Sequence, residues 1–481
     1  MQVPLRRFAH AVLLYSWHQL EPADSFGLDL WIHNNAAKLH NPVNPANTRD
    51  PMNPHTRPGP PMARTLAQKL VAKAAGQPHV TPGQIVTCKV DLAMFHDSSG
   101  PRRLAPMLER LGATVWDRDK IVLITDHYVP GWDDDSRKIL QFTRDWARAN
   151  QINNFYDGEG ICHVVLPQKG HLKPGLFAVG GDSHSPTGGA FGAYMFGVGA
   201  TEMLGVVVTG EIWLRVPETI LMQWDGTLGA GVTAKDMMLF LCGKFGMDGG
   251  RYQAVEFGGS AIRALSMQER MTLANMTAEL GGQAGLIAAD ETTQQFLQTA
   301  GAKDADIATW QSDAGAPFDE HHVFDAGTLE PQVAAPHSPA NSRGVSDYDE
   351  VIDVAYIGAC TGAKLVDLRA AAAVLRGKRV ASNVQLLVAP ASRQDQAIAA
   401  SEGVMQVLVD AGARVLPNAC GVCAGYSDDR FGENVRVISS TARNFKGRMG
   451  AVSSQVFLAS PYTVAASAVA GKKADPRGML A

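Results

Sequence analysis

Short apolar runs alternate with amphipathic stretches over most of the chain beyond residue 62. In the C-terminal part, residues 351–358, 384–390 and 413–417 are rich in aliphatic and β-branched side chains, which predicts buried strands. The stretches between them, 363–375 and about 394–411, predict helices. Strands that alternate with helices of this length indicate an α/β fold with parallel sheets.

The N-terminal part continues this pattern. A helix is predicted to begin near Met62, because Leu66, Leu70 and Val71 fall on one helical face. The remaining apolar runs predict strands at 121–130, 160–167, 176–180 and the start of 435–450, and a helix at 200–213.

Two segments break the pattern. Residues 1–61 accumulate His, Asn and Pro without an apolar period, which predicts a disordered or peripheral extension. Residues 311–350 are rich in Pro, Asp, His and Ser, which predicts a linker on the surface.

Composition narrows the class of protein. At 481 residues the chain is long enough for about three domains, and 46% hydrophobic residues can fill packed cores. The net charge of −4 is spread without a basic block, which argues against nucleic acid and membrane surfaces as partners. No apolar run approaches the roughly 18 residues of a membrane span. The six cysteines lack the spacing of a disulfide framework, so we expect a soluble, cytoplasmic protein.

Three cysteines follow predicted strands. Cys360 follows the strand at 351–358, and Cys420 and Cys423 form a C-x-x-C pair after the strand at 413–417. Ligands of parallel sheets bind beyond the carboxyl ends of the strands. Three thiolates leave a metal centre one protein ligand short, as a Lewis-acid catalyst requires, which indicates an iron–sulfur cluster. A C-x-x-C pair alone also occurs in redox and zinc sites.

Histidines and carboxylates also lie in or directly after predicted strands. Asp126 and His127 lie at the end of the strand at 121–130, where a carboxylate can orient the imidazole and raise its pKa. An ordinary polar turn is the alternative. His163 lies in the apolar run 160–167, where a histidine without a partner is a core residue.

A glycine-rich segment offers His163 a partner. Asp182, Ser183 and His184 follow the strand at 176–180, and the glycines after them allow backbone N–H groups to bind a carboxylate. The sequence GVG at 197–199 lacks the third glycine of a dinucleotide fingerprint, and the G-x-S-x-G elbow of hydrolases is absent.

Two further pairs of polar residues are candidates for the functional site. Asn275 and Glu279 are spaced i,i+4 and share one face of a predicted helix. Arg443 and Arg448 follow the strand that begins at 435, where guanidinium groups can bind carboxylates in bidentate fashion. Solvated surface side chains are the alternative for both pairs.

Together these motifs resemble the aconitase superfamily, most closely the large subunits of 3-isopropylmalate dehydratase and of homoaconitase-type enzymes. The likeness covers nearly all of residues 62–481. It implies three α/β/α domains around a central cluster-binding cleft, without the swivel domain: two intertwined domains over 62–340 and a third over 346–481. The motifs are TDH (125–127), GICH (160–163), GDSHSPTGGAFGA (181–193), GVTAKDM (231–237), SMQERMTLANMTAELGGQAGLIAADETT (266–293), EPQVAAPHSP (330–339), GACTGAKLVDLRAA (358–371), CGVC (420–423) and RNFKGR (443–448).

The resemblance also implies roles for individual residues. Three cysteines would hold a 4Fe-4S cluster, namely Cys360, Cys420 and Cys423. The catalytic acids and histidines would pair as Asp126 with His127, Asp182 with His163, and Glu279 with His184. The substrate would be bound by His96, Ser183, Asn275, Arg443 and Arg448.

The implied reaction is the removal of water from a hydroxy di- or tricarboxylic acid. The resemblance favours a 3-isopropylmalate dehydratase of leucine biosynthesis, and a homoaconitase, dimethylmalate dehydratase or aconitase-like enzyme is the alternative. In these dehydratases the proton-abstracting serine lies on a small swivel-domain subunit, so we expect a heterodimer in which this chain is half of the enzyme. An RNA-binding or zinc-binding family member without activity is the alternative outside the enzymes.

Two positions depart from the family pattern. Gly362 and Ala442 stand where asparagines are usual, one near a cluster ligand and one before a substrate arginine. We therefore expect the hydrogen bonds around the cluster and the substrate to differ, and the substrate preference with them.

Overall fold

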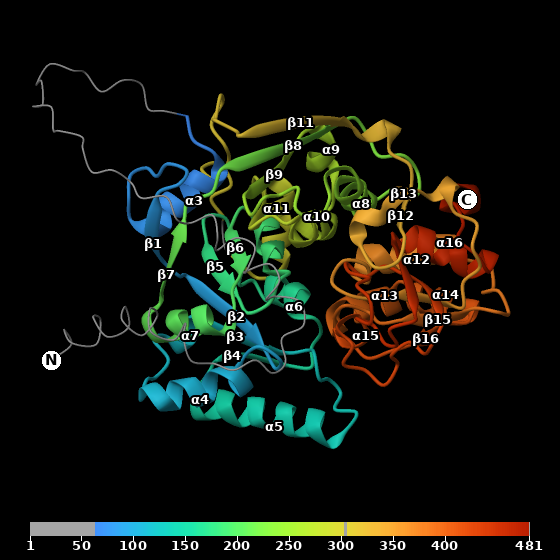
Figure 1. The fold of residues 1–481 in the computed structure, drawn as a ribbon, viewed down its shortest axis with the longest axis horizontal. Coiled ribbons are helices and arrows are strands. Elements are labelled where there is room, and N and C mark those ends of the chain that lie inside the picture. Colours follow the sequence, from blue (N-terminus) through green and yellow to red (C-terminus); the bar gives the residue numbers. More distant parts are fainter. Residues whose placement is uncertain (1–62, 303–304, 481) are drawn as a thin grey trace, which may run out of the picture. The chain divides into compact units, whose positions relative to one another are not determined.

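Helices and strands alternate along the chain, as the apolar pattern predicts (Figure 1). The computed structural model describes residues 63–302 and 305–480. The extension predicted over residues 1–61 lies outside the described residues. Three sheets of parallel or mostly parallel strands organise the described part, which confirms the predicted α/β class.

The first sheet has five parallel strands in the order β4-β3-β2-β5-β6. Alternate residues face two different cores: Met94 and Ile124 pack in one, and Phe95 and Leu123 pack in the other. Because both faces are buried, the three central strands β3, β2 and β5 are apolar apart from His96 and Thr125 at their ends, whereas the edge strand β4 is half-buried and carries polar residues. The strands are β2 Leu92–His96, β3 Ile121–Thr125, β4 Asn154–Asp157, β5 Phe177–Gly180 and β6 Tyr194–Gly197.

Helices and a small ribbon accompany the first sheet. Helices α4 and α5 lie side by side (Figure 1). Strand β1 pairs with β7 in antiparallel fashion. The elements are α3 Leu66–Ala75, β1 Ile85–Lys89, α4 Pro101–Leu111, α5 Asp134–Ala149, α6 Cys162–Gln168, α7 Ala200–Thr209 and β7 Glu211–Arg215.

The second sheet has four parallel strands in the order β10-β9-β8-β11. Helix α10 begins with a capping box between Ser266 and Glu269 and ends at Gly281 in the left-handed region. Most of its side chains are buried, so its polar residues face the interior of the protein. The elements are β8 Thr219–Asp225, α8 Ala234–Phe245, β9 Ala254–Gly258, α9 Ser260–Ala264, α10 Met267–Leu280, β10 Ala284–Ile287, α11 Glu291–Thr299 and β11 Glu320–Asp325.

The third sheet has seven strands in the order β13-β12-β18-β17-β14-β15-β16. The pairs from β18 to β16 are parallel, and β12 pairs with both of its neighbours in antiparallel fashion. The elements are β12 Gln332–Ala334, β13 Ser342–Gly344, β14 Val354–Ile357, α12 Leu365–Leu375, β15 Gln385–Val388, α13 Arg393–Ser401, α14 Val404–Ala411, β16 Arg414–Val415, α15 Gly421–Ala424, β17 Arg436–Ser439, β18 Gln455–Ala459 and α16 Pro461–Ala470.

Several local predictions were wrong. The run 160–167 is helix α6 rather than a strand, because a short apolar run does not distinguish a buried helix from a buried strand. The helix predicted over 394–411 is divided in two at Gly403, whose φ is +74°. The helix predicted over 200–213 ends at Thr209, where strand β7 begins two residues later.

The segment 311–350 is not a simple surface linker. Strand β11 joins the second sheet beside β8, and β12 joins the third sheet beside β18. The side chains of β11 alternate between half-buried and exposed, so its composition is polar although it is a strand. The predicted domain boundaries at 340 and 346 stay a prediction.

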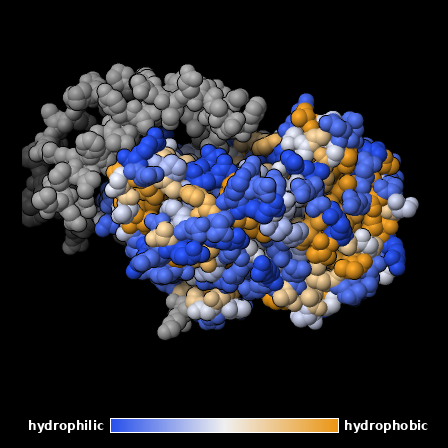
Figure 2. Space-filling model, turned by 90° about the horizontal axis from the view of Figure 1, so that it is seen from below, coloured by the Kyte–Doolittle hydropathy of each residue, from blue (hydrophilic) through white to orange (hydrophobic). Residues whose placement is uncertain are grey.

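Figure 2 shows one face of the surface, where hydrophilic residues predominate and hydrophobic residues form smaller patches among them. In the part of the chain that the structure describes, no helix is both long and apolar enough to cross a membrane. The buried apolar side chains of the described residues form four clusters within and between the sheets.

Candidate active site

Residues that were predicted from separate parts of the sequence meet in the structure. Arg443, which follows β17, donates from Nη1 to Ser183 Oγ at 2.8 Å, across 260 positions of sequence. Its Nε donates to Glu279 Oε1 at 2.5 Å. The backbone N–H of Cys420 donates to the carbonyl oxygen of Asp126 at 2.9 Å. These contacts join loops of the first and third sheets to helix α10.

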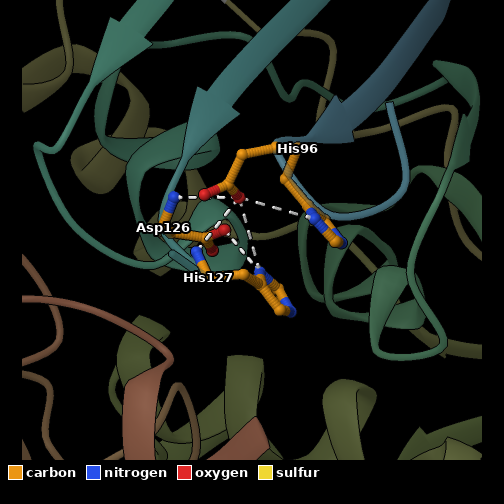
Figure 3. Close-up of side chains that lie close together, drawn as sticks. His96, Asp126 and His127 are labelled. Atoms are coloured by element: carbon orange, nitrogen blue, oxygen red, sulfur yellow. Dashed lines mark hydrogen bonds and ion pairs between the residues drawn. The ribbon is translucent and has the colours of Figure 1, made fainter. Parts of the chain in front are cut away.

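Asp126 and His127 form a buried pair at the end of β3 (Figure 3). His127 Nδ1 lies 2.6 Å from Asp126 Oδ1, and Asp126 Oδ2 accepts a hydrogen bond from the backbone N–H of Cys162 at 2.7 Å. Burial alone would lower the pKa of His127, but the charge of Asp126 raises it to about 10. His127 is therefore a cation at neutral pH, with Nε2 left to donate a proton.

The sequence analysis missed Asp97, which follows His96 at the end of β2. Its carboxylate accepts hydrogen bonds from three consecutive backbone N–H groups, those of Asp126, His127 and Tyr128, at 2.8–3.3 Å. The side chain is completely buried. The signal that could have found it is a histidine and an aspartate together after the apolar run LAMF, the same composition as Asp126-His127 after IVLIT.

Two further imidazole–carboxylate pairs lie nearby, as the resemblance implies. His163 Nε2 lies 2.7 Å from Asp182 Oδ1, and His184 Nε2 lies 3.0 Å from Glu279 Oε1. Burial lowers the pKa of His163 from its ordinary value. Burial would raise the pKa of Glu279, but Arg443 and His184 lower it to about 2. Burial and Arg443 would lower the pKa of His184, but Glu279 and Asp182 raise it, so the pKa values of the two histidines shift in opposite directions.

The three cysteines also lie at this site. The thiol of Cys420 and the charge of Arg448 lower the pKa of Cys423 to about 5, which favours the thiolate that binds metal. Burial raises the pKa of Cys360 to about 12. No disulfide forms among the described residues, since all six cysteines there are free thiols.

The three thiols do not form one compact group. In the described part of the chain there are two groups of three or more possible ligand atoms, and within each group the atoms lie within 4.8 Å of one another. Neither group includes a cysteine, so at least one pair of the three sulfur atoms is farther apart than this. Sulfur atoms around one zinc ion would lie about 3.8 Å apart, given a tetrahedral site with Zn–S bonds of about 2.3 Å.

Several predicted site residues have buried polar atoms without a hydrogen-bond partner among the described residues. Asn275 Nδ2 donates to Cys360 Sγ at 3.2 Å and to Thr187 Oγ1 at 2.8 Å. Among the described residues, ten buried side-chain N and O atoms have no hydrogen-bond partner, and four of them belong to predicted site residues. Because buried polar groups are nearly always hydrogen-bonded, these atoms fit a polar ligand in the site. They are His96 Nε2, Asn275 Oδ1, Glu279 Oε2 and Arg448 Nε.

Two buried lysines hold the loop that carries Cys360, and the sequence analysis did not single them out. Lys235 Nζ donates to Thr361 Oγ1 at 3.3 Å and to the carbonyl oxygens of residues 440 and 441. Lys364 Nζ donates to Thr272 Oγ1 and to the carbonyl oxygen of Cys360, both at 2.9 Å. The motifs GVTAKDM and GACTGAK contain them, but a lysine in an apolar stretch gives no signal of its own.

Ser440 occupies the space beside Gly362. A Cβ atom at Gly362 would lie 2.3 Å from both Cβ and Oγ of Ser440 and 2.4 Å from its carbonyl oxygen. The Ser440 hydroxyl accepts a hydrogen bond from the N–H of Gly358 and donates to the carbonyl oxygens of Gly358 and Gly362. Ala442 is 1% exposed. Gly362 therefore lies where the Cys360 loop packs closely against Ser440, and Ala442 is buried two residues after Ser440.

The sequence model of the aconitase family (aconitate hydratase) matches residues 68–351 and 341–471. The chain belongs to the aconitase family. It is 41% identical over 418 residues to the 3-isopropylmalate dehydratase large subunit of Hydrogenobaculum sp. (strain Y04AAS1), which covers 86% of this chain and 98% of that protein. It is 40% identical to 3-isopropylmalate dehydratase large subunit 1 of Methanopyrus kandleri, which covers 87% of this chain and 100% of that protein.

Among solved structures, the holo-form of Thermococcus kodakaraensis aconitase X aligns with a TM-score of 0.42 and 12% identity, over 74% of this chain and 84% of that chain. That likeness is too weak to support an argument about the site. The resemblance predicted from the motifs is confirmed by the family match and by the relatives at about 40% identity.

Proposed function

We propose that this chain is the large subunit of an iron–sulfur hydro-lyase of the aconitase family, which removes and adds water on a hydroxy di- or tricarboxylic acid, most closely 3-isopropylmalate. Its relatives at about 40% identity carry the name 3-isopropylmalate dehydratase large subunit. The observation that carries the proposal is the meeting of three features within one buried site: His127 paired with Asp126, Arg443 hydrogen-bonded to Ser183, and three free cysteines.

The residues suit an elimination of water. A 4Fe-4S cluster bound by Cys360, Cys420 and Cys423 would supply an open iron site, which acts as a Lewis acid toward the hydroxyl group that leaves. His127 donates the proton that the leaving hydroxyl needs, since Asp126 keeps it charged.

Other side chains bind the carboxylates of the substrate. Arg443, fixed by Glu279 and Ser183, presents a guanidinium to a substrate carboxylate. Arg448 presents a second one, since its Nε is buried without a partner among the described residues. The base that removes the carbon-bound proton comes from a small swivel-domain subunit, which the words "large subunit" in the relatives' names support.

A related dehydratase for another hydroxy acid is the second candidate. Gly362 and Ala442 favour it, because the missing amides lie beside a cluster ligand and before Arg443. Ser440 fills the space at Gly362, and its hydroxyl bonds to backbone groups of the Cys360 loop.

Co-expression with a candidate small subunit tests the proposal. After anaerobic reconstitution with iron and sulfide, the complex is assayed for hydration and dehydration of isopropylmalate, citrate, homocitrate and dimethylmalate. We expect turnover of isopropylmalate above the other three. Preference for another of these acids selects the second candidate, inactivity on all four refutes both, and full activity of this chain alone contradicts the need for a partner.

A further inference from the structure

We propose that Asp97 is a positioning residue that holds His127 in the orientation of a proton donor. The inference rests on the proposed function, since it needs His127 to act as the acid. Asp97 is completely buried and follows directly on His96, the last residue of β2. It acts through the backbone of the loop that follows β3.

The hydrogen bonds of Asp97 define the turn after β3. Oδ1 accepts from the N–H groups of Asp126 at 3.3 Å and His127 at 3.1 Å, and Oδ2 accepts from that of Tyr128 at 2.8 Å. A buried backbone N–H group needs a partner, and a carboxylate that binds three of them fixes the path of the chain. The Cβ of His127 therefore leaves the backbone in a defined direction.

The imidazole ring of His127 is also held by Asp126. Asp126 Oδ1 lies 2.6 Å from His127 Nδ1, and Asp126 Oδ2 is occupied by the N–H of Cys162. Nε2 is the nitrogen of His127 that neither contact uses. Without the turn that Asp97 holds, Asp126 and His127 lose the backbone geometry that brings their side chains together.

Asp97 also adds charge beside the ring. Its Oδ1 lies 3.9 Å from His127 Nδ1 and 3.8 Å from His96 Nδ1. The groups that face His127 are the carboxylates of Asp97, Asp126 and Asp182, the ring of His96 and the ring of Tyr426. Two carboxylates in contact with one imidazole favour its cationic form.

The same four side chains do not offer a ready metal site. The ligand atoms of His96, Asp97, Asp126 and His127 lie within 4.8 Å of one another. However, both oxygens of Asp97 accept backbone N–H groups, and both oxygens of Asp126 are also engaged. The arrangement is satisfied by hydrogen bonds, as expected of positioning groups.

The test compares Asp97→Asn and Asp97→Glu with the wild type as the reconstituted two-subunit complex. Asp97→Asn keeps the shape but replaces one acceptor oxygen with an N–H₂ group that faces N–H donors. We expect kcat to fall by at least about 100-fold, the lower end of what a positioned acid contributes, with KM within about threefold of wild type. Asp97→Glu, which keeps the carboxylate, retains more of kcat than Asp97→Asn.

Asp395→Asn is the matched control for losing a buried carboxylate. Asp395 is 2% exposed and accepts from Gln268, outside the proposed site. The inference is overturned if Asp97→Asn stays within about threefold of the wild-type kcat, if Asp97→Glu is no better than Asp97→Asn, or if Asp395→Asn loses as much activity.

A second readout separates this inference from the proposed function. If the wild-type complex is inactive on every hydroxy acid, the proposed function fails. Crystal structures of the wild-type and Asp97→Asn full-length chains then decide. A displaced turn at 126–128 with a longer contact between Asp126 Oδ1 and His127 Nδ1 supports the role of Asp97, and an unchanged turn overturns it.

Discussion

His96 and His127 stack face to face, with ring centroids 3.8 Å apart and planes inclined by 8°. His96 Nδ1 accepts hydrogen bonds from the backbone N–H groups of Ser98 and Ser99. His96 Nε2 lies 3.6 Å from Asp182 Oδ2. The stacked rings are thus held by different groups, since His127 Nδ1 contacts Asp126 Oδ1 at 2.6 Å.

Replacing His127 with asparagine tests directly whether His127 is the proton donor. The variant keeps a polar side chain of similar reach but removes the ionisable group, so we expect kcat to fall by about 10²- to 10⁴-fold with a smaller change in KM. Steady-state kinetics of the reconstituted complex measure both. His171→Asn is the control, because His171 contacts Tyr156 outside the site. Near-normal kcat in His127→Asn would show that another group is the acid.

Arg443→Lys tests substrate binding. Lysine keeps the charge but cannot contact Ser183 and Glu279 together while facing a carboxylate. We expect a loss of about 1.5 to 3 kcal/mol of binding free energy, or about one to two orders of magnitude in KM. Arg436→Lys is the control, since that arginine pairs with Asp353 at the surface. A KM equal to that of the wild type would remove Arg443 from the substrate site.

Much of the site followed from where apolar runs end. Cys360 and Asp126 were found because buried strands are readable in sequence and parallel sheets bind ligands at their carboxyl ends. His163 was assigned to a strand, because its run is too short to have a visible helical period. Asp97 was missed although it stands beside His96 after an apolar run, and Lys235 could not be found. The roles of both depend on backbone groups of loops that are distant in sequence.

Gly362→Asn tests the close packing of Gly362 against Ser440. The new side chain meets Ser440, and overpacking of this kind costs about 1 to 3 kcal/mol of unfolding free energy. Adding Ser440→Gly should recover part of the loss, because two of the three close atoms then disappear. Urea unfolding measures both variants. Gly478→Asn is the control, since nothing lies within 4 Å of a Cβ there and its φ is not in the left-handed region. Wild-type stability of Gly362→Asn would contradict the packing described.

The pH dependence of stability tests the Asp126–His127 pair. The pKa of His127 is raised from 6.5 to about 10, so its contribution is complete below pH 6.5 and is lost as pH rises toward 10. The pKa of Asp126 is lowered from 3.8 to about 2, so its contribution is complete above pH 3.8 and is lost as pH falls toward 2. We expect the difference in unfolding free energy between wild type and His127→Asn to be largest between pH 3.8 and 6.5.

His171 provides the opposite case. Burial lowers its pKa, so His171 favours the folded state less as pH falls through its ordinary range. The difference between wild type and His171→Asn should therefore change in the other direction on acidification. A difference for His127→Asn that stays constant from pH 6.5 to 10 would contradict the charged pair.

The central claim is that Cys360, Cys420 and Cys423 together hold an iron–sulfur cluster with one open iron. Iron and acid-labile sulfide analysis with Mössbauer spectroscopy, after anaerobic reconstitution, tests it most directly. We predict about four iron and four sulfide per chain, lost in Cys360→Ser and retained in Cys88→Ser, with one iron whose spectrum changes when the hydroxy acid is added. Stoichiometric zinc without sulfide, or a full cluster in Cys360→Ser, would contradict the account.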